Sequence, residues 1–194
     1  IRLSGEPYIL HPVAVAHILA GMRMDHESIT AAILHDTLED TPLSKTEIEE
    51  QFGKEIAQLV DGVTKLDKMK FRTRGEADAE SFRKLMLAMS RDLRVIFIKL
   101  ADRVHNMRTL DQMSYESRRR IARETLEVYA PIADRLGMNN IKSELEDLGF
   151  SNLYPWRYRT INEHLDQMTG HRKEIVENIN SALKKRMNDA AVPC

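Results

Sequence analysis

The sequence predicts an all-α protein, and three observations support this fold class. Glycine and proline, which favour turns over helices, account for only 8 and 6 of the 194 residues. Apolar residues recur at spacings of three and four in one segment after another, which is the period of an amphipathic helix. A helix-capping pattern, Ser44 followed three residues later by Glu47, separates two of these segments. We therefore expect a helical bundle with a helical extension at its C-terminal end.

Four helices are expected in the first part of the chain. Pro12 suits the first turn of the first helix, because its missing N–H would have no partner there. Ser44 caps the start of the third helix, and Gly53 ends it, since glycine accepts the backbone conformation that closes a helix. The expected helices cover residues 12–21, 26–38 and 44–53 and a segment that includes 56–63.

The remainder of the chain predicts one loop and further helices. Residues 65–78 are polar, basic and weakly periodic, which indicates a loop. The β-branched stretch 95–98 could be a buried strand, but the apolar face continues past it without a turn residue, which favours a buried helix. Pro131 should kink the helix in which it lies. The expected helices cover 79–89, 93–110, 114–137, 140–148, 155–168 and 173–187.

Composition excludes several classes of protein. Hydrophobic residues make up 42% and charged residues 30% of the chain, which is neither disordered nor membrane-embedded composition. The single cysteine, Cys194, excludes a disulfide framework and a cysteine zinc site. A net charge of −1 argues against a nucleic-acid-binding surface. With no apolar leader at the start and no membrane-spanning run, the sequence predicts a cytoplasmic protein with no membrane partner.

The segment His35-Asp36-Thr37-Leu38-Glu39-Asp40 carries the chemistry. It places one imidazole and three carboxylates at the end of an otherwise apolar helix. Crowding ionisable groups there costs desolvation energy unless a cation or other partners compensate. A divalent metal ion would compensate for several of them at once. Glu39 or Asp40, just outside the coordination sphere, could then orient or deprotonate a water molecule.

Two further segments could complete such a site. His11 stands at a predicted helix start and could bring a second imidazole. At helical spacing, one face of the predicted helix 93–110 carries five polar side chains: Lys99, Asp102, Arg103, Asn106 and Thr109. Asp102 can ligate a metal, the two cations can meet phosphate oxygens, and the amide and hydroxyl can bond a base or sugar. Imidazoles and carboxylates without cysteine suit octahedral Mn²⁺ or a similar ion better than structural zinc.

Ordinary structural roles compete with these assignments. An isolated His-Asp dipeptide arises often by chance, and the polar face of 93–110 could simply be solvated. The remaining histidines are expected at the surface or in satisfied hydrogen bonds. They are His17, His26, His105, His164 and His171.

Taken together, these segments resemble the hydrolase domain of the RelA/SpoT family, which handles the alarmones ppGpp and pppGpp. Within that family the likeness is to the bifunctional members of proteobacteria. The resemblance covers nearly the whole chain and goes well beyond the His-Asp dipeptide. The matching segments are 2–12, 35–40, 63–67, 99–110, 119–126 and 144–150.

The resemblance implies an α-helical His-Asp (HD) metal phosphohydrolase with one Mn²⁺ ion. The implied reaction removes the 3′-pyrophosphate of ppGpp or pppGpp and leaves GDP or GTP. Carried over by position, the metal ligands are His11, His35, Asp36 and Asp102, the water-activating pair is Glu39 and Asp40, and the guanosine contacts are Arg2, Ser4, Asn106 and Thr109. Lys99 and Arg103 are added here as phosphate contacts on their helical spacing. Leu3 departs from the family pattern, which puts one base or sugar contact in doubt.

The family also implies an order of domains. Residues 1–150 would form the hydrolase domain, and residues 151–194 a helical linker toward a synthetase domain absent from this chain. Regulatory domains, which in some relatives bind an acyl carrier protein, would follow. Two alternatives to the alarmone hydrolase stay open: a His-Asp phosphohydrolase for another nucleotide, and a regulatory module that binds nucleotide without turnover.

Overall fold

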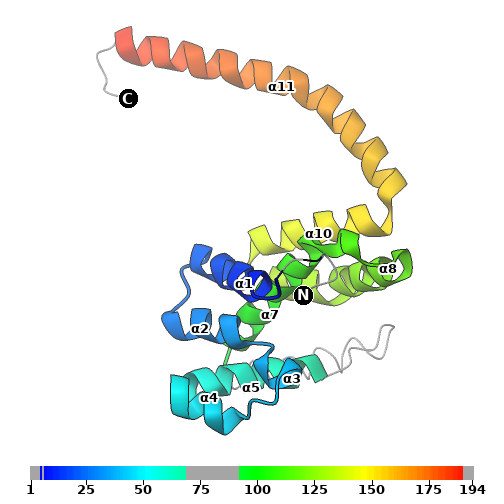
Figure 1. The fold of residues 1–194 in the computed structure, drawn as a ribbon. Coiled ribbons are helices and arrows are strands. Elements are labelled where there is room, and N and C mark those ends of the chain that lie inside the picture. Colours follow the sequence, from blue (N-terminus) through cyan, green and yellow to red (C-terminus); the bar gives the residue numbers. More distant parts are fainter. Residues whose placement is uncertain (1–4, 6, 69–91, 190–194) are drawn as a thin grey trace. The chain divides into compact units, whose positions relative to one another are not determined.

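The computed structural model describes residues 5, 7–68 and 92–189, and all regular structure in these residues is helical (Figure 1). This confirms the all-α prediction. The helices are α1 (Leu10–Gly21), α2 (His26–Leu34), α3 (Thr37–Asp40), α4 (Lys45–Phe52), α5 (Lys54–Lys68), α7 (Arg94–Arg108), η1 (Leu110–Gln112), α8 (Tyr115–Glu124), the π-helical η2 (Thr125–Tyr129), α9 (Ala130–Arg135), α10 (Asn139–Leu153) and α11 (Pro155–Asp189).

The chain divides into two units, residues 1–153 and 154–194. The first unit contains the helices from α1 to α10, and the second consists mainly of α11. In the second unit the guanidinium of Arg157 lies 5.5 Å from the ring centre of Tyr154. In the part of the chain that is described, no helix combines the length and the apolar character needed to cross a membrane.

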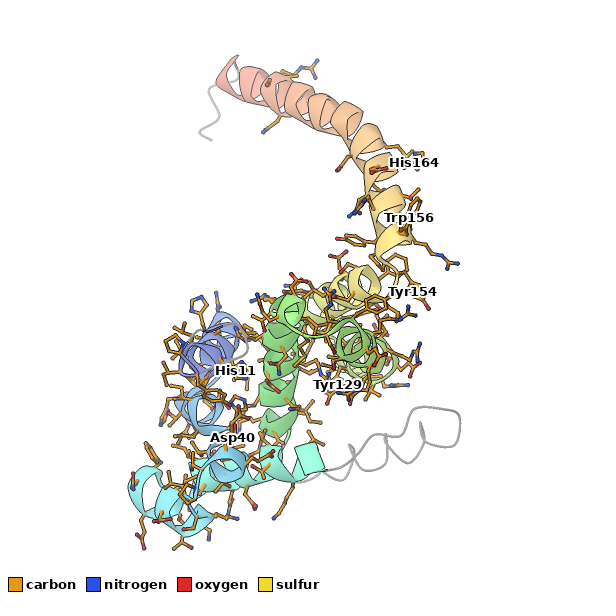
Figure 2. The ribbon with its side chains drawn as sticks, turned by 45° about the vertical axis from the view of Figure 1, so that its right-hand side comes forward. His11, Asp40, Tyr129, Tyr154, Trp156 and His164 are labelled. Carbon is orange, nitrogen blue, oxygen red and sulfur yellow. The ribbon has the colours of Figure 1, made fainter. Side chains whose placement is uncertain are left out.

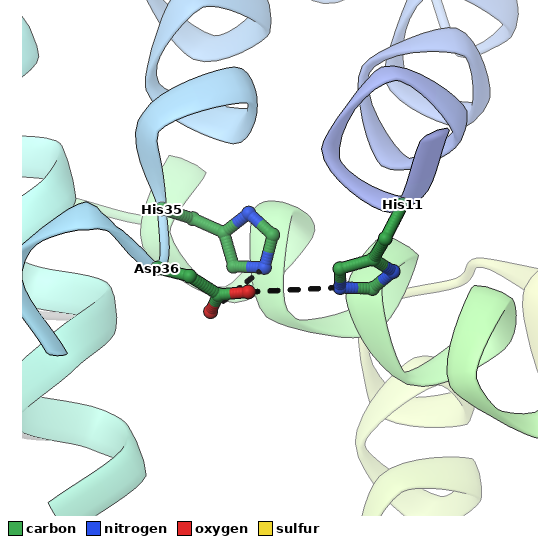
Figure 3. Close-up of side chains that lie close together, drawn as sticks. All are labelled: His11, His35 and Asp36. Carbon is green, nitrogen blue, oxygen red and sulfur yellow. Dashed lines mark ion pairs between the residues drawn. The ribbon is translucent and has the colours of Figure 1, made fainter. Parts of the chain in front are cut away.

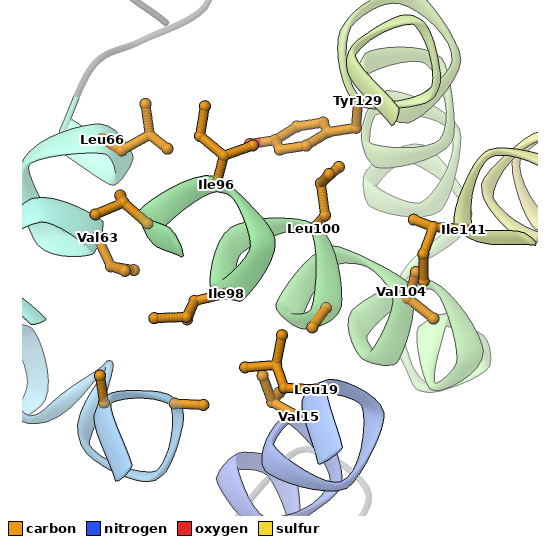
Figure 4. Close-up of a cluster of buried hydrophobic side chains, with 14 of the residues drawn as sticks. Val15, Leu19, Val63, Leu66, Ile96, Ile98, Leu100, Val104, Tyr129 and Ile141 are labelled. Carbon is orange, nitrogen blue, oxygen red and sulfur yellow. The ribbon is translucent and has the colours of Figure 1, made fainter. Parts of the chain in front are cut away.

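Helix α7 is the centre of the first unit, where it contacts α1, α2, α5 and α10. The stretch 95–98 is helical, so the strand alternative is wrong. Its apolar side chains are buried because other helices cover α7 on several sides (Figure 4). The cluster joins Val15 and Leu19 of α1, Val63 and Leu66 of α5, Tyr129 of η2 and Ile141 of α10 to Ile96, Ile98, Leu100 and Val104 of α7.

The predicted helix 26–38 is interrupted, and the interruption lies at the His-Asp pair. Helix α2 ends at Leu34 and α3 begins at Thr37. Asp36 has φ −91° and ψ −6°, a sparsely populated turn conformation in which active-site residues are often found. The Thr37 hydroxyl donates to the carbonyl oxygen of Leu34 at 2.6 Å and so satisfies an acceptor at the helix end.

Several other helix boundaries in the structure differ from the predicted ones. The segment 114–137 divides into α8, a π-helical turn and α9, and the π-helical turn ends just before Pro131, which cannot donate a backbone hydrogen bond. Helix α10 continues past 148 to Leu153 and passes through Gly149, where a Cβ atom would lie 2.7 Å from Cγ of Leu126. Helix α11 passes Gly170 without a break, since a helix tolerates one interior glycine at a cost of about 1 kcal/mol.

Two predictions concern the segment after α5. Helix α5 extends to Lys68, so the predicted loop 65–78 begins as helix. The rest of that loop and the predicted helix 79–89 lie outside the described residues. The capping box of Ser44 with Glu47 is confirmed, and Gly53 ends α4 with φ 93°.

Gly62 allows α5 to pack closely against α7. A Cβ atom at this position would lie 2.7 Å from Cγ2 of Val95. We expect Gly62→Ala to lower the free energy of unfolding by about 1–2 kcal/mol, because the clash exceeds the gain in helix propensity. The measurement is urea unfolding of Gly62→Ala, of Val95→Ala and of the double variant. Val95→Ala should relieve the clash, so additive effects of the two substitutions would contradict the assignment.

Candidate metal centre

Three segments far apart in the sequence bring four side chains together. His11 comes from the first turn of α1, His35 and Asp36 from the break between α2 and α3, and Asp102 from the middle of α7. Figure 3 shows the first three converging, with both imidazoles directed at the Asp36 carboxylate. The two histidines and Asp102 are buried, whereas the Asp36 side chain is 29% exposed. The cluster therefore opens toward solvent on the side of Asp36.

The four side chains form a ring of nitrogen and oxygen atoms. Nε2 of His11 lies 3.1 Å from Oδ1 of Asp102. Nε2 of His35 lies 3.1 Å from Oδ1 of Asp36. The two remaining imidazole–carboxylate separations, His11 to Asp36 and His35 to Asp102, are both 3.8 Å. Two ligand atoms at right angles and each about 2.1 Å from one ion would be roughly 3 Å apart.

The environment of His35 suits a metal ligand. Its Nδ1 lies 2.6 Å from the carbonyl oxygen of Ala32, an acceptor, so the ring proton belongs on Nδ1. In the neutral ring Nε2 then carries a lone pair, and it points into the cluster. This atom is buried, the side chain is 1% exposed, and Nε2 makes no hydrogen bond to the residues that are described. A buried nitrogen left without a hydrogen bond is costly, and a cation at the cluster would satisfy it.

Charges around the cluster keep both carboxylates ionised. Burial alone would raise the pKa of Asp102, but the charge of Lys99 and the contact with His11 hold the pKa of that carboxyl well below its usual range. Burial also opposes ionisation of Asp36, but the positive charge of a protonated His35 imidazole and the hydrogen bond from the Tyr8 hydroxyl outweigh it and lower the pKa of Asp36. The ligand atoms of His11, His35 and Asp36 all lie within 4.8 Å of one another, so these three residues could hold a metal ion.

Asp102 is held by neighbours one turn away on α7. Lys99 donates to its Oδ2 at 2.7 Å, and the Asn106 amide donates to its Oδ1 at 2.6 Å. Oδ1 is also the atom that faces the two imidazoles. The geometry therefore assigns one oxygen of Asp102 to Lys99 and directs the other toward the cluster.

The other predicted substrate contacts on α7 interact with neighbouring groups of the protein. Arg103 pairs with Glu124 at 3.1 Å and its guanidinium carbon lies 3.9 Å from the ring centre of Tyr129. The Thr109 hydroxyl donates to the carbonyl oxygen of His105 at 3.1 Å. The side chains of Lys99 and Arg103 are only 12% and 11% exposed, so this helix face is not simply solvated. Arg2 and Ser4 lie outside the described residues.

The predicted water-activating pair lies on α3, the helix that begins directly after Asp36. Glu39 and Asp40 are both exposed, and Figure 2 shows Asp40 on the same side of the first unit as His11. Exposure leaves these two carboxylates accessible to a substrate or to water. They follow Asp36 by three and four residues, and the hydroxyl of Tyr8 joins Asp40 to Asp36.

Sequence reasoning missed two residues that contact the cluster. The Tyr8 hydroxyl contacts Asp36 closely and lies 3.1 Å from Oδ2 of Asp40. Nδ1 of His105 lies 2.7 Å from Nδ1 of His11, although His105 was expected to have an ordinary surface or structural role. Spacing offered a signal for both, since Tyr8 precedes His11 by one helical turn and His105 follows Asp102 by one turn.

Comparisons with known proteins identify a matching domain family and several relatives that cover nearly all of this chain. A family described as "HD domain" matches residues 2–139. The chain is 58% identical over 193 residues to the Escherichia coli K12 protein named "Bifunctional (p)ppGpp synthase/hydrolase SpoT", covering 100% of this chain and 28% of that protein. It is 57% identical to a Vibrio cholerae protein named "Guanosine-3′,5′-bis(diphosphate) 3′-pyrophosphohydrolase", covering 99% of this chain and 27% of that protein.

Similarity extends to more distant relatives. A Myxococcus xanthus protein named "GTP pyrophosphokinase" is 47% identical over 96% of this chain and 25% of its own length. A solved structure titled "A metazoan ortholog of SpoT hydrolyzes ppGpp and plays a role in starvation responses" matches with a TM-score of 0.52 at 25% identity, covering 75% of this chain and 81% of that one. The chain thus spans about a quarter of the length of its curated relatives, and the likeness to the RelA/SpoT family is confirmed.

Proposed function

Because the chain belongs to the HD-domain family, we propose that its His/Asp cluster binds one divalent cation and hydrolyses the 3′-pyrophosphate of ppGpp and pppGpp. The names of its relatives support this substrate. The observation that carries the proposal is the convergence of His11, His35, Asp36 and Asp102, with the buried Nε2 of His35 left without a hydrogen bond. The ion we propose is Mn²⁺ or a similar ion, because two imidazole nitrogens and two carboxylates without thiolate suit an octahedral site better than structural zinc.

The chain's own residues supply the steps of the reaction. A bound cation supplies Lewis acidity toward a phosphoryl oxygen. Glu39 or Asp40 accepts a proton from water as its oxygen adds to the phosphorus next to the ribose. The bond between that phosphorus and O3′ breaks, pyrophosphate departs, and O3′ takes up a proton to become a hydroxyl. The products are GDP or GTP and pyrophosphate. The proposed substrate contacts on α7 remain Lys99, Arg103, Asn106 and Thr109.

The relatives' greater length supports a proposal about the rest of the protein. The Escherichia coli relative is named a synthase as well as a hydrolase, and this chain spans 28% of it. We propose that residues 1–150 form the hydrolase domain and that 151–194 lead toward a synthetase domain, with regulatory domains beyond it.

A substrate panel tests the proposed reaction. The purified chain with Mn²⁺ is incubated separately with ppGpp, pppGpp, GTP and ATP, and products are separated by anion-exchange chromatography. We expect equal amounts of GDP and pyrophosphate from ppGpp, equal amounts of GTP and pyrophosphate from pppGpp, and intact GTP and ATP. Release of inorganic phosphate, comparable cleavage of ATP, or tight ppGpp binding without any cleavage would contradict the proposal.

Tyr8 links a proposed ligand to a proposed proton acceptor, so its hydroxyl should affect the rate. Tyr8→Phe removes the contacts with Asp36 and Asp40 and keeps the ring. We expect turnover of ppGpp to fall about tenfold, because one hydrogen bond to a charged group contributes about 1.5 kcal/mol or more. Tyr115→Phe, which alters an exposed tyrosine on α8, is the matched control. Equal rates for both variants and the unmodified chain would show that the Tyr8 hydroxyl is not used.

A further inference from the structure

His105 lies directly behind His11, on the side away from the cluster. It stands on α7 three residues after Asp102, and its ring centre lies 4.8 Å from that of His11 at an angle of 45°. The two Nδ1 atoms are 2.7 Å apart, which is hydrogen-bond distance. The opposite nitrogen of His11, Nε2, is the one that faces Asp102 and Asp36.

An imidazole can offer only one lone pair in its neutral form. For Nε2 of His11 to face a cation with a lone pair, the proton of the ring must be on Nδ1. A ligating histidine is normally held in this tautomer by an acceptor for its other N–H. Ala32 supplies that acceptor for His35 through its carbonyl oxygen. For His11 the atom in the corresponding place is Nδ1 of His105.

We propose that His105 is a positioning residue for His11, whose Nδ1–H it accepts and whose ring plane it fixes. The inference rests on the metal site in the proposed function and adds a residue to it. His11 is only 3% exposed, so water could not replace His105 as the acceptor. Removing His105 would therefore leave the Nδ1–H of His11 buried without a partner, which is costly. Because His105 and Asp102 stand one turn apart on the same helix, α7 sets both the ligand Asp102 and the orientation of the ligand His11.

The backbone near the end of α7 supports this role. The carbonyl oxygen of His105 accepts a hydrogen bond from the Thr109 N–H at 3.2 Å and another from the Thr109 hydroxyl at 3.1 Å. Both bonds hold His105 within the last turn of the helix. Its imidazole is thereby presented to α1 from a rigid element, as a positioning group requires.

Three substitutions test the proposal through metal affinity. His105→Phe keeps a ring of similar shape and removes the acceptor, whereas His105→Asn offers an amide oxygen near the position of Nδ1. His17→Phe, at an exposed position of α1, is the matched control. EDTA-treated protein is titrated with Mn²⁺ alone, and the free ion is followed by electron paramagnetic resonance. Thermal unfolding of the metal-free variants shows whether each is folded.

We expect His105→Phe to weaken Mn²⁺ binding by about 10–100-fold, the usual effect of removing a group that orients a ligand. His105→Asn should recover most of that loss, and His17→Phe should bind as the unmodified chain does. Equal affinity in folded His105→Phe and the unmodified chain would overturn the role of His105. If His105→Phe does not fold, the failure of His105→Asn to bind more tightly than Asp102→Asn would overturn it. Absence of Mn²⁺ binding by the unmodified chain would instead contradict the proposed function.

Discussion

Asp102→Ala is expected to abolish divalent-cation binding and ppGpp hydrolysis together. Oδ1 of Asp102 faces both imidazoles of the cluster and is the only contribution of α7 to the proposed ligand set. Its loss removes a buried negative charge that helps to compensate the cation. We expect Mn²⁺ affinity to fall by more than about 100-fold, beyond the range for groups that merely orient a ligand. Calorimetric titration and the rate of pyrophosphate release measure the two losses.

Controls separate this effect from a general loss of structure. Asp102→Asn keeps the volume of the side chain beside Lys99 and Asn106, so it should fold and still lose the metal. Asp111→Ala changes an aspartate whose side chain is 83% exposed and should leave affinity and rate unchanged. Retention of Mn²⁺ by folded Asp102→Asn with normal affinity would exclude Asp102 from the ligand set.

Glu39→Gln is expected to keep the metal and lose the rate. Glu39 is exposed on α3, outside the ring formed by the two histidines and two aspartates. The substitution preserves shape and removes the proton acceptor, and general-base catalysis of this kind contributes about 10²–10⁴ in rate. Mn²⁺ affinity should stay within about threefold of the unmodified chain, since the ligands of the cluster are unchanged.

A glutamate at another exposed position provides the matched control for Glu39→Gln. Glu49→Gln, at an exposed position of α4, should have normal affinity and a normal rate. A loss of Mn²⁺ binding in Glu39→Gln as large as that in Asp102→Ala would make Glu39 a ligand. A normal rate in Glu39→Gln would leave Asp40 as the candidate for proton acceptance.

Much of the fold can be predicted from the sequence because most helices carry an apolar face or a capping residue within their own segment. The apolar face from Val95 to Met107 predicts α7, and the Ser44 capping box predicts the start of α4. The failures arise where tertiary packing decides. Gly149 lies inside α10, where Leu126 leaves no room for a side chain, so this glycine marks a packing contact and not the end of the helix. The break after His35 serves contacts with side chains from α1 and α7, which the local sequence does not contain.

The candidate site shows the same division. The His-Asp segment, His11 and Asp102 could be named from residue chemistry and family resemblance, and the structure brings them within contact. Tyr8 and His105 stand at helical spacing from His11 and Asp102, but spacing does not specify the atoms that they contact in other segments. Arg103 has the spacing expected of a phosphate contact, yet in the structure it pairs with Glu124 and Tyr129. Spacing gives the face of a helix but not the neighbours on that face.

Restoring the metal to stripped protein tests whether one His/Asp metal site hydrolyses ppGpp. The purified chain is treated with EDTA, dialysed and supplied with Mn²⁺ in increasing amounts while pyrophosphate release from ppGpp is measured. We expect no release without metal, and activity that rises to a plateau at about one Mn²⁺ per chain, because one cluster supplies all the ligands. Pyrophosphate release by the stripped chain, or ppGpp left intact by folded chain saturated with Mn²⁺, would contradict the claim.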